Sequence, residues 1–319
     1  MGIYQLLKIV EPERHLYIQT HNFPDHDALA TAFGLQSLLA KLNKPATIIY
    51  DGLVERSSLK ELCARMGIEA WQVKEVDLRP EDKIVIVDGC KYNKNVTDLI
   101  GDEIGIIDHH EVTAPEDVLY IDIRPDYGAC VSIIFDYYRE AGLSLSSKMA
   151  SVFLCGLQMD TQFMTRGVSL RDLELYTTCY SLADIRLVNQ LLRNYIQQED
   201  LKFYKRAIEH LWIKDGFAFC YFDEGCNQNL LGIIGDFLLS LREADLVFLC
   251  AKNNEQINFS VRSEVKRWHA AQIIQTLLKG RGYGGGHAEM AAGIIPFCPH
   301  FSHTEIYAEL HKLLTSLPA

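Results

Sequence analysis

The sequence contains no run of apolar residues as long as the roughly 18 that a membrane-spanning helix needs. Residues 1–14 lack the pattern of a secretory signal peptide, and no segment has the low complexity of a disordered tract. These absences lead us to expect a soluble, cytoplasmic protein without a membrane partner.

Paired thiols of the C-x-x-C type are also missing. The nine cysteines are scattered and odd in number, so the sequence indicates neither a disulfide framework nor a thiolate zinc site. We expect most of these thiols to be reduced and buried.

Positive charge is scarce, since 31 lysines and arginines stand against 42 acids and give a formal net charge of -11. Binding to long nucleic acid is driven by lysine and arginine that neutralise phosphates, so this charge excludes a protein that coats a long duplex. A short anionic substrate remains compatible. Carboxylates that face divalent cations would offset part of the negative charge.

The composition, with 48% hydrophobic and 23% charged residues, is that of an ordinary globular protein. A single core stops growing at about 250–300 residues, so a chain of 319 residues is expected to form two domains. Strand and helix patterns alternate up to Tyr120, which indicates a mostly parallel α/β sheet. From Tyr120 to His210 the pattern favours helices, and a second, smaller α/β domain follows. We place the first domain at residues 1–185, a helical linker at 186–212 and the second domain at 213–319.

The individual elements follow from apolar periodicity. In the first domain we expect strands at 15–20, 46–50, 83–87 and 104–107, and helices at 28–42, 58–66, 129–141, 147–159 and 169–182. In the second domain we expect strands at 217–222, 246–251 and 257–261, helices at 230–241, 269–279 and 302–317, and a glycine-rich turn at 282–287.

Polar side chains stand where three of the expected strands end. They are His21, Asp25 and Asp27 after the first strand, Asp88 after the third, and Asp108, His109 and His110 after the fourth. Because the carboxyl ends of parallel strands meet at one edge of a sheet, we expect these side chains to converge. Asp160, with Thr161 at the end of an apolar helix, is a further candidate.

Each of these residues alone has an ordinary structural explanation. Asp25 or Asp27 would cap the following helix, and Asp88 would form a turn with Gly89. Together, however, carboxylates and imidazoles without thiolates suit manganese, magnesium, iron or zinc, and their number exceeds the needs of one ion. Two ions about 3.5–4 Å apart would use this number of ligands and generate a hydroxide that attacks phosphorus.

The second domain carries the positive charge that the whole chain lacks. Between residues 252 and 287, six lysines or arginines stand against two acids. The glycines of residues 284–286 let backbone N–H groups approach an anion closely, and His287 adds a donor. A flexible loop explains the same glycines equally well.

The motifs, taken in order, resemble the DHH phosphoesterase family. The resemblance rests on the stretch HNFPDHDA at 21–28, VDG at 87–89, DHH at 108–110 and DT at 160–161. The later stretches FSVRS at 259–263, GGGH at 284–287 and AAG at 291–293 are similar to the DHH-associated C-terminal domain of the RecJ-like branch. The resemblance covers essentially the whole chain and implies a catalytic domain, a substrate-binding domain and an active site in the cleft between them.

Residue functions are implied by the resemblance alone. One manganese ion would be held by His21, Asp25 and Asp88, and the other by Asp27, Asp88, His109 and Asp160. Asp108 would orient a histidine or a backbone group, and His110 would face the substrate phosphate. The far end of the substrate would be bound by Arg262, Ser263, Gly284, Gly285, Gly286 and His287. Magnesium, iron and cobalt are the alternatives to manganese.

A chain with only these two domains resembles the nano-RNase and pAp phosphatase group within the family. The resemblance implies hydrolysis of short oligoribonucleotides, linear dinucleotides such as pApA, and 3'-phosphoadenosine 5'-phosphate. A cyclic dinucleotide phosphodiesterase is the enzymatic alternative, and a catalytically silent nucleotide-binding protein is the alternative outside the enzymes. A homodimer is compatible with the resemblance.

Two residues depart from the family pattern. His26 stands between the two aspartates where a small residue is common, and we expect its side chain to point outward, with a metal ligand or a substrate contact as alternatives. Gln162 follows Asp160 and Thr161 where glycine is common, and it would narrow the site or bind the phosphate. Neither residue replaces a predicted ligand, so both bear on substrate preference.

Overall fold

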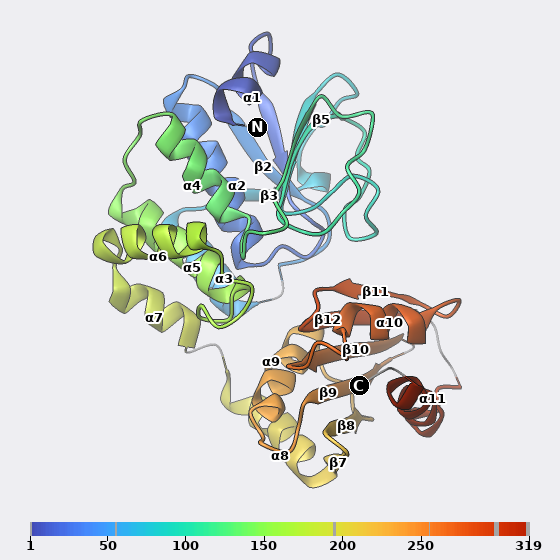
Figure 1. Cartoon of the computed structure of the whole chain (residues 1–319). Coiled ribbons are helices and arrows are strands. Elements are labelled where there is room, and N and C mark those ends of the chain that lie inside the picture. The colour runs from blue at the N-terminus through green and yellow to red at the C-terminus, as the bar shows by residue number, and fades with distance from the viewer. Residues whose placement is uncertain (1, 55, 194–195, 255, 297–299, 317–319) are drawn as a thin grey trace. The chain divides into compact units, whose positions relative to one another are not determined.

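The computed structural model describes residues 2–54, 56–193, 196–254, 256–296 and 300–316 (Figure 1). The chain divides into two compact units, Met1–Tyr195 and Ile196–Ala319. Helices α7 (Ile185–Arg193) and α8 (Leu201–His210) occupy the stretch for which the sequence predicts a helical linker. The domain boundaries at 185 and 213 stay a prediction.

The first unit contains a sheet of six strands in the order β3-β2-β1-β4-β5-β6, and every neighbouring pair is parallel. The strands are β1 Leu16–Gln19, β2 Ala46–Tyr50, β3 Ala70–Gln72, β4 Lys83–Val87, β5 Asp102–Asp108 and β6 Tyr120–Ile123. The expected parallel α/β fold is therefore confirmed. The strands β1, β4 and β5, whose ends carry the polar clusters, are adjacent in the middle of the sheet.

The helices of the first unit bury apolar residues in its core. Besides α7, they are α1 Ile3–Ile9, α2 His26–Lys41, α3 Ser57–Met66, α4 Val131–Glu140, α5 Ser147–Asp160 and α6 Leu170–Leu182, and the short 3-10 helix η1 spans Val73–Glu75. Helix α1 is not among the helices expected from the sequence. Helix α2 packs against both α4 and α5, and its residues 26–35 are buried without exception. A helix that is enclosed on all sides belongs in a protein interior, so α2 forms the centre of this core.

Residues 120–123 form the strand β6, although the sequence pattern favours helices from Tyr120 onward. The expectation is wrong for this stretch because the strand is short and includes the buried acid Asp122, which interrupts the apolar pattern. Asp122 is satisfied by Arg124, whose Nη2 lies 2.8 Å from its Oδ2, and by the Tyr137 hydroxyl at 2.7 Å. The helices that the pattern favours begin after this strand, with α4.

The second unit contains a mixed sheet of six strands in the order β11-β12-β10-β9-β8-β7. The strands are β7 Trp212–Lys214, β8 Phe217–Phe222, β9 Leu246–Asn253, β10 Gln256–Ser263, β11 Tyr283–Gly286 and β12 Met290–Ile295. Only β8 and β9 pair in parallel among these described strands. The helices of this unit are α8, α9 Gln228–Leu239, α10 Ala270–Leu278 and α11 His303–Ser316, preceded by the 3-10 helix η2 Gln198–Asp200.

The long apolar stretch of β9 follows from burial of both faces of this sheet. Leu246, Phe248 and Cys250 belong to one hydrophobic cluster, while their neighbours Val247 and Leu249 belong to another. A strand covered on both faces reads as a continuous apolar run rather than an alternating one. The expected second, smaller α/β domain is confirmed.

Within the glycine-rich segment at 282–287, residues 283–286 form the strand β11, so the expected turn is wrong. Residues 283–286 pair antiparallel with β12, and a side chain at Gly284 would place its Cβ 2.7 Å from the carbonyl oxygen of Ala292 and 3.0 Å from Ile274. Glycine therefore permits close packing of a strand here instead of marking a loop.

Within the described residues, no helix is both long enough and apolar enough to cross a membrane. Eight cysteines in this part of the chain carry free thiols, and all of them except Cys63 are buried. Cys298 lies outside the described residues.

Candidate metal centre

The polar clusters meet where the three central strands of the first sheet end. In one group His21, Asp25 and Asp88 each offer a ligand atom, and these atoms lie within 4.8 Å of one another. In a second group the same holds for Asp27, Asp88 and His109. Both groups contain Asp88, so this carboxylate lies between them.

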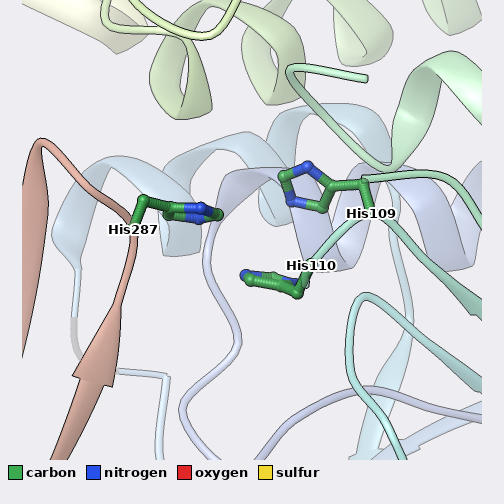
Figure 2. Close-up of side chains that lie close together, drawn as sticks. All are labelled: His109, His110 and His287. Carbon is green, nitrogen blue, oxygen red and sulfur yellow. The ribbon is translucent and has the colours of Figure 1, made fainter. Parts of the chain in front are cut away.

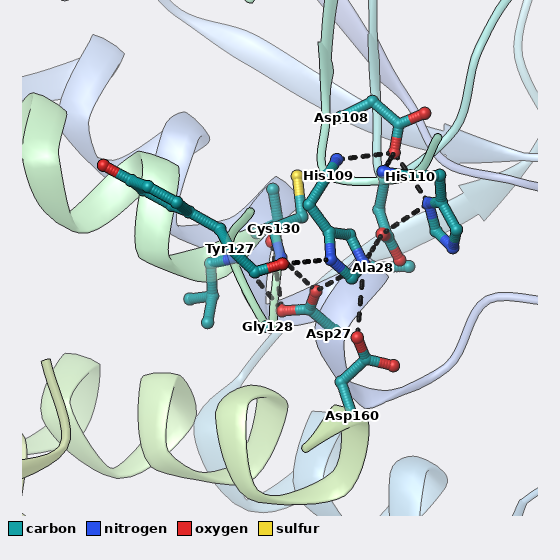
Figure 3. Close-up of polar contacts among 12 residues, drawn as sticks. Asp27, Ala28, Asp108, His109, His110, Tyr127, Gly128, Cys130 and Asp160 are labelled. Atoms are coloured by element: carbon teal, nitrogen blue, oxygen red, sulfur yellow. Dashed lines mark hydrogen bonds and ion pairs between the residues drawn. The ribbon is translucent and has the colours of Figure 1, made fainter. Parts of the chain in front are cut away.

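Asp160 joins the second group through His109. Its Oδ2 lies 3.2 Å from the Nε2 atom of His109, and this Nε2 atom lies 4.0 Å from Asp27 Oδ2 (Figure 3). The same Nε2 atom lies 3.4 Å from Asp88 Oδ1. The structure thus brings together all the residues for which the sequence predicts metal binding, namely His21, Asp25, Asp27, Asp88, His109 and Asp160.

Asp88 is held in an unusual backbone conformation. Its φ of 52° lies in the left-handed region, and its N–H group donates to the carbonyl oxygen of Ile107 at 2.9 Å. Residues other than glycine adopt this region at a cost, which is found most often where a side chain must be aimed at a functional site. The carboxylate is buried, and its Oδ2 lies 3.8 Å from the Nε2 atom of His21.

Asp25 also caps a helix, as the structural explanation of the sequence allows. Its Oδ1 accepts hydrogen bonds from the N–H groups of Asp27 at 2.9 Å and Ala28 at 3.1 Å, at the start of α2. A carboxylate has two oxygens, so a cap at Oδ1 is compatible with a metal ligand at Oδ2.

Asp27 is fixed by the beginning of a different helix. The N–H group of Cys130 donates to its Oδ2 at 2.6 Å, and that of Val131 donates to its Oδ1 at 3.1 Å. These donors belong to the N-terminus of α4, where the helix dipole favours negative charge. The orientation of Asp27 is therefore set by a segment about a hundred residues away in the sequence.

His109 and His110 receive different partners although they are adjacent. The Nδ1 atom of His109 lies 3.0 Å from the carbonyl oxygen of Tyr127, so it carries the proton and Nε2 faces the carboxylates. The Nδ1 atom of His110 lies 2.7 Å from Asp108 Oδ1, which also accepts the backbone N–H groups of both histidines. The two imidazole rings lie with their centroids 4.4 Å apart (Figure 2).

The crowding of acids changes their protonation. Burial raises the pKa of Asp160 to about 7, with the charges of Asp25 and Asp88 adding to the effect and His109 opposing it. Burial, and then the charges of Asp88 and Asp160, raises the pKa of Asp27 well above its ordinary value. A divalent ion would relieve the repulsion among these carboxylates.

The residues present fit a metal ion. Asp88 Oδ1 is buried and accepts no well-aligned hydrogen bond from the described residues, and the nearest imidazole nitrogens are His109 Nε2 at 3.4 Å and His110 Nδ1 at 3.9 Å. Carboxylates and imidazoles are also the ligands that manganese and related ions accept.

Manganese is expected to stabilise the protein against heat. A ligand that binds only the folded state adds about 2.7 kcal/mol at a concentration of 100 times its Kd. At roughly 2–4 °C per kcal/mol, the Tm of the first unit should rise by about 5–10 °C. Differential scanning calorimetry of chelator-treated protein with and without manganese measures this shift. An unchanged Tm at millimolar manganese would contradict a metal site at the cluster.

His26 is buried completely, so the expectation of an outward-pointing side chain is wrong. Its Nε2 atom lies 3.2 Å from the Ser58 hydroxyl of α3, because the start of α2 is enclosed by protein. Burial lowers the pKa of His26 to about 3, so the ring is neutral. His26 fills a packed position between Asp25 and Asp27 rather than reaching solvent.

Gln162 lies in a left-handed turn that follows α5. The φ angles of Gln162, Phe163 and Met164 are 47°, 59° and 66°. Glycine adopts such angles without strain, which explains in physical terms why glycine suits this position. Whether Gln162 contacts a phosphate stays a prediction.

In the second unit, Arg262 has partners of its own. Its Nε donates to Asp236 Oδ1 at 2.7 Å, and its Nη1 donates to the Ser260 hydroxyl at 3.2 Å. The side chain packs on α9, where a Cβ added at Gly232 would lie 2.7 Å from Nη2. Arg262 therefore stabilises this unit, and its contact with a substrate stays a prediction.

The other residues expected at the substrate differ in exposure. Ser263 is buried, and its hydroxyl donates to the carbonyl oxygen of Val265 at 3.2 Å. A Cβ added at Gly285 would meet no atom within 4 Å, so space is open beside β11. The N–H group of His287 donates to the carbonyl oxygen of Met290 at 2.7 Å. Their functions also stay predictions.

Sequence reasoning missed the segment 127–131, which supplies a carbonyl oxygen to His109 and two N–H groups to Asp27. These are backbone groups, which carry no residue signature. The small residues Gly128 and Ala129 just before α4 are the one available signal, since they allow close backbone approach. The buried acid Asp172, which accepts the N–H of Gly128 at 2.8 Å, was missed as well.

Comparison with known proteins agrees with this arrangement. Residues 15–157 match the N-terminal domain of the DHH family, and residues 214–304 match the DHHA1 domain. An uncharacterized protein of Methanocaldococcus jannaschii is 29% identical over 290 residues, which are 90% of this chain and 59% of the relative. The cyclic-di-AMP phosphodiesterase GdpP of Bacillus subtilis is 26% identical over 317 residues, covering 91% of this chain and 47% of GdpP. The chain spans about half the length of these curated relatives.

Solved structures share the fold at low identity. An exopolyphosphatase-related protein from Bacteroides fragilis has a TM-score of 0.81 at 16% identity, covering 97% of this chain and 94% of that one. RecJ in complex with Mn2+ from Thermus thermophilus has a TM-score of 0.55 at 14% identity, covering 98% of this chain and 54% of RecJ. With its DHH N-terminal domain followed by a DHHA1 domain, the chain belongs to the DHH family.

Proposed function

We propose that the chain is a manganese-dependent phosphoesterase that hydrolyses short oligoribonucleotides, linear dinucleotides of the pApA type and 3'-phosphoadenosine 5'-phosphate. The observation that carries this proposal is the position of Asp88, which is shared by the group with His21 and Asp25 and the group with Asp27 and His109. A carboxylate shared in this way would hold two ions close together, as in two-metal phosphoesterases.

We assign one metal site to each of the two ligand groups. The first metal site consists of His21, Asp25 and Asp88, and the second metal site consists of Asp27, Asp88, His109 and Asp160. When bound there, two divalent ions supply a hydroxide nucleophile at neutral pH and neutralise charge on the phosphoryl oxygens. Manganese is the preferred ion because the structurally similar RecJ was solved with Mn2+.

His110 would face the substrate phosphate and donate a hydrogen bond to it from its Nε2 atom. Burial lowers the pKa of this imidazole, but the hydrogen bond to Asp108 and the charges of Asp88 and Asp108 together raise it above its ordinary value. Asp108 thereby keeps Nδ1 engaged, so that the side chain, which is 35% exposed, can present Nε2 to negative charge. Asp108 would act through His110 rather than on the substrate.

The DHHA1 domain would bind the end of the substrate remote from the scissile phosphate. Its contribution would come from Arg262, Ser263 and the segment 284–287, in a region with more lysine and arginine than acid. A short substrate is consistent with the acidic net charge of -11, which disfavours long nucleic acid. A homodimer stays a prediction, and light scattering on the full chain measures it.

A cyclic dinucleotide phosphodiesterase is the second candidate, because GdpP matches 91% of the chain. Hydrolysis rates for pApA, short RNA, 3'-phosphoadenosine 5'-phosphate and cyclic di-AMP, at equal concentration with manganese, separate the candidates. We expect the linear substrates to exceed cyclic di-AMP by about tenfold or more in kcat/KM, or about 1.4 kcal/mol of barrier. Faster cyclic di-AMP hydrolysis would favour the second candidate. Absence of all turnover with manganese bound would favour a silent nucleotide-binding protein.

A further inference from the structure

The segment 127–131, which we call the α4 turn, contacts two ligands of the second metal site. The carbonyl oxygen of Tyr127 lies 3.0 Å from His109 Nδ1, and the N–H group of Cys130 donates to Asp27 Oδ2 at 2.6 Å (Figure 3). A shift of this turn would therefore move an imidazole and a carboxylate together.

The α4 turn is held from outside by Asp172 of α6. Asp172 is fully buried, and its Oδ2 accepts the N–H group of Gly128 at 2.8 Å while its Oδ1 accepts the hydroxyl of Ser132. The packing is close, because a Cβ added at Gly128 would lie 3.0 Å from Asp172 Oδ2 and 2.6 Å from the carbonyl oxygen of Gly167. The turn consequently has little room to adopt another position.

We propose that Asp172 is a positioning residue for the second metal site. By fixing the α4 turn, it holds Asp27 and His109 where they can bind one ion. The inference rests on the proposed two-metal function. The hydrogen bonds that tie the turn to ligands reach Asp27 and His109 alone among the described metal-site residues, so the first metal site should not depend on Asp172.

The size of the effect follows from the geometry of metal binding. Groups that orient a ligand without touching the ion change metal affinity by about 10–100-fold when they are removed. Asp172 orients two ligands at once through a single turn. Its own carboxylate is occupied by hydrogen-bond donors and is absent from the groups of ligand atoms around Asp88.

Asp172 has a second, purely structural function that the experiment must separate. It takes part in the capping box of α6, where its N–H group donates to the Ser169 hydroxyl and its Oδ2 accepts the N–H of Ser169 at 2.8 Å. The Ser169 hydroxyl also donates to Oδ2 at 2.6 Å. Ser169→Ala removes this hydroxyl and leaves the N–H groups of Gly128 and Ser169 as donors to Oδ2. It is therefore the control for loss of the cap with the contact between Asp172 and Gly128 retained.

The test is a manganese titration of the full chain by calorimetry, with Tm measured in parallel. Asp172→Ala should raise the Kd of the second metal site by about 10–100-fold and leave the first within about twofold. Asp172→Asn keeps a carbonyl oxygen for Gly128 and an amide for Ser132, so it should restore most of the affinity. Ser169→Ala should lower Tm and leave both Kd values within about twofold.

Combining Asp172→Ala with the loss of one metal ligand shows which of the two metal sites Asp172 supports. In His21→Ala, where only the second metal site is complete, Asp172→Ala should retain its full effect, whereas in His109→Ala it should have none. Equal weakening of both sites, or an equal effect in both backgrounds, would overturn the proposal. If Asp172→Ala does not fold, Gly128→Ala displaces the same turn and must give the same selective loss. A wild-type chain without two manganese sites would instead refute the proposed function.

Discussion

Asp88→Ala should abolish turnover and empty both metal sites. Asp88 is the residue that the two ligand groups share, so its removal takes a ligand from each. Metal ions contribute several kcal/mol of charge stabilisation in such reactions, and about 1.4 kcal/mol corresponds to a factor of ten. We therefore expect kcat to fall by about 10³-fold or more, measured with pApA and saturating manganese.

Asp88→Asn controls for the backbone at this position. Asparagine tolerates the left-handed region better than alanine, so it preserves the φ of 52° while it removes the charge. Asp51→Asn is the matched control elsewhere, because Asp51 follows the neighbouring strand β2 and bonds to Thr97. We expect Asp88→Asn to be as inactive as Asp88→Ala, and Asp51→Asn to be active. Near-normal turnover by Asp88→Asn would show that the shared ligand is assigned wrongly.

Arg262→Ala should raise KM for short nucleotides by about 10–100-fold and change kcat by less than about threefold. Hydrogen bonds to a charged group contribute about 1.5–3 kcal/mol, which corresponds to this range. Steady-state kinetics with pApA measures the division between KM and kcat. Lysine should not restore binding, since its ammonium group lacks the planar set of donors of arginine.

Asp236→Ala distinguishes recognition of the substrate from support of the fold. It removes the ion-pair partner of Arg262, at 2.7 Å, and leaves the guanidinium in place. If Arg262 only stabilises the second unit, both variants should lose stability and activity alike. If Arg262 binds the substrate, Asp236→Ala should lower Tm while KM stays within about threefold of the wild-type value.

The sequence predicts the central strands of the first sheet well. Each is a short apolar run followed by acids or histidines, and this pattern is compatible with few arrangements of the strands. The strands β2 and β4 have the expected bounds, and the order of the strands brings Asp88 beside His21 and His109. In a parallel sheet the carboxyl ends of the strands lie at one edge. The convergence of these side chains can therefore be predicted without knowing the loop conformations.

The features that the sequence does not predict depend on contacts with residues elsewhere in the chain. The buried acid Asp122 in β6 is compatible with a strand only because Arg124 and Tyr137 satisfy it. Gly284 lies in a strand because Ile274 and Ala292 approach it closely. The link from Asp172 to Gly128 spans 44 residues and ends on a backbone N–H group, which no residue pattern marks.

His26 is a residue whose burial the sequence does not predict. A polar residue between two aspartates predicts a solvent-facing side chain, yet Ser58 of α3 covers it. The burial of the first turn of α2 is a property of the packed unit, which local sequence does not encode.

The most direct test of two metal sites that share Asp88 is the number of manganese ions bound per chain, measured by elemental analysis after equilibrium dialysis. We expect two ions in the wild type, one in each of His21→Ala and His109→Ala, and none in Asp88→Asn. A wild-type chain that binds a single ion, or an Asp88→Asn chain that retains two, would contradict the shared-ligand arrangement.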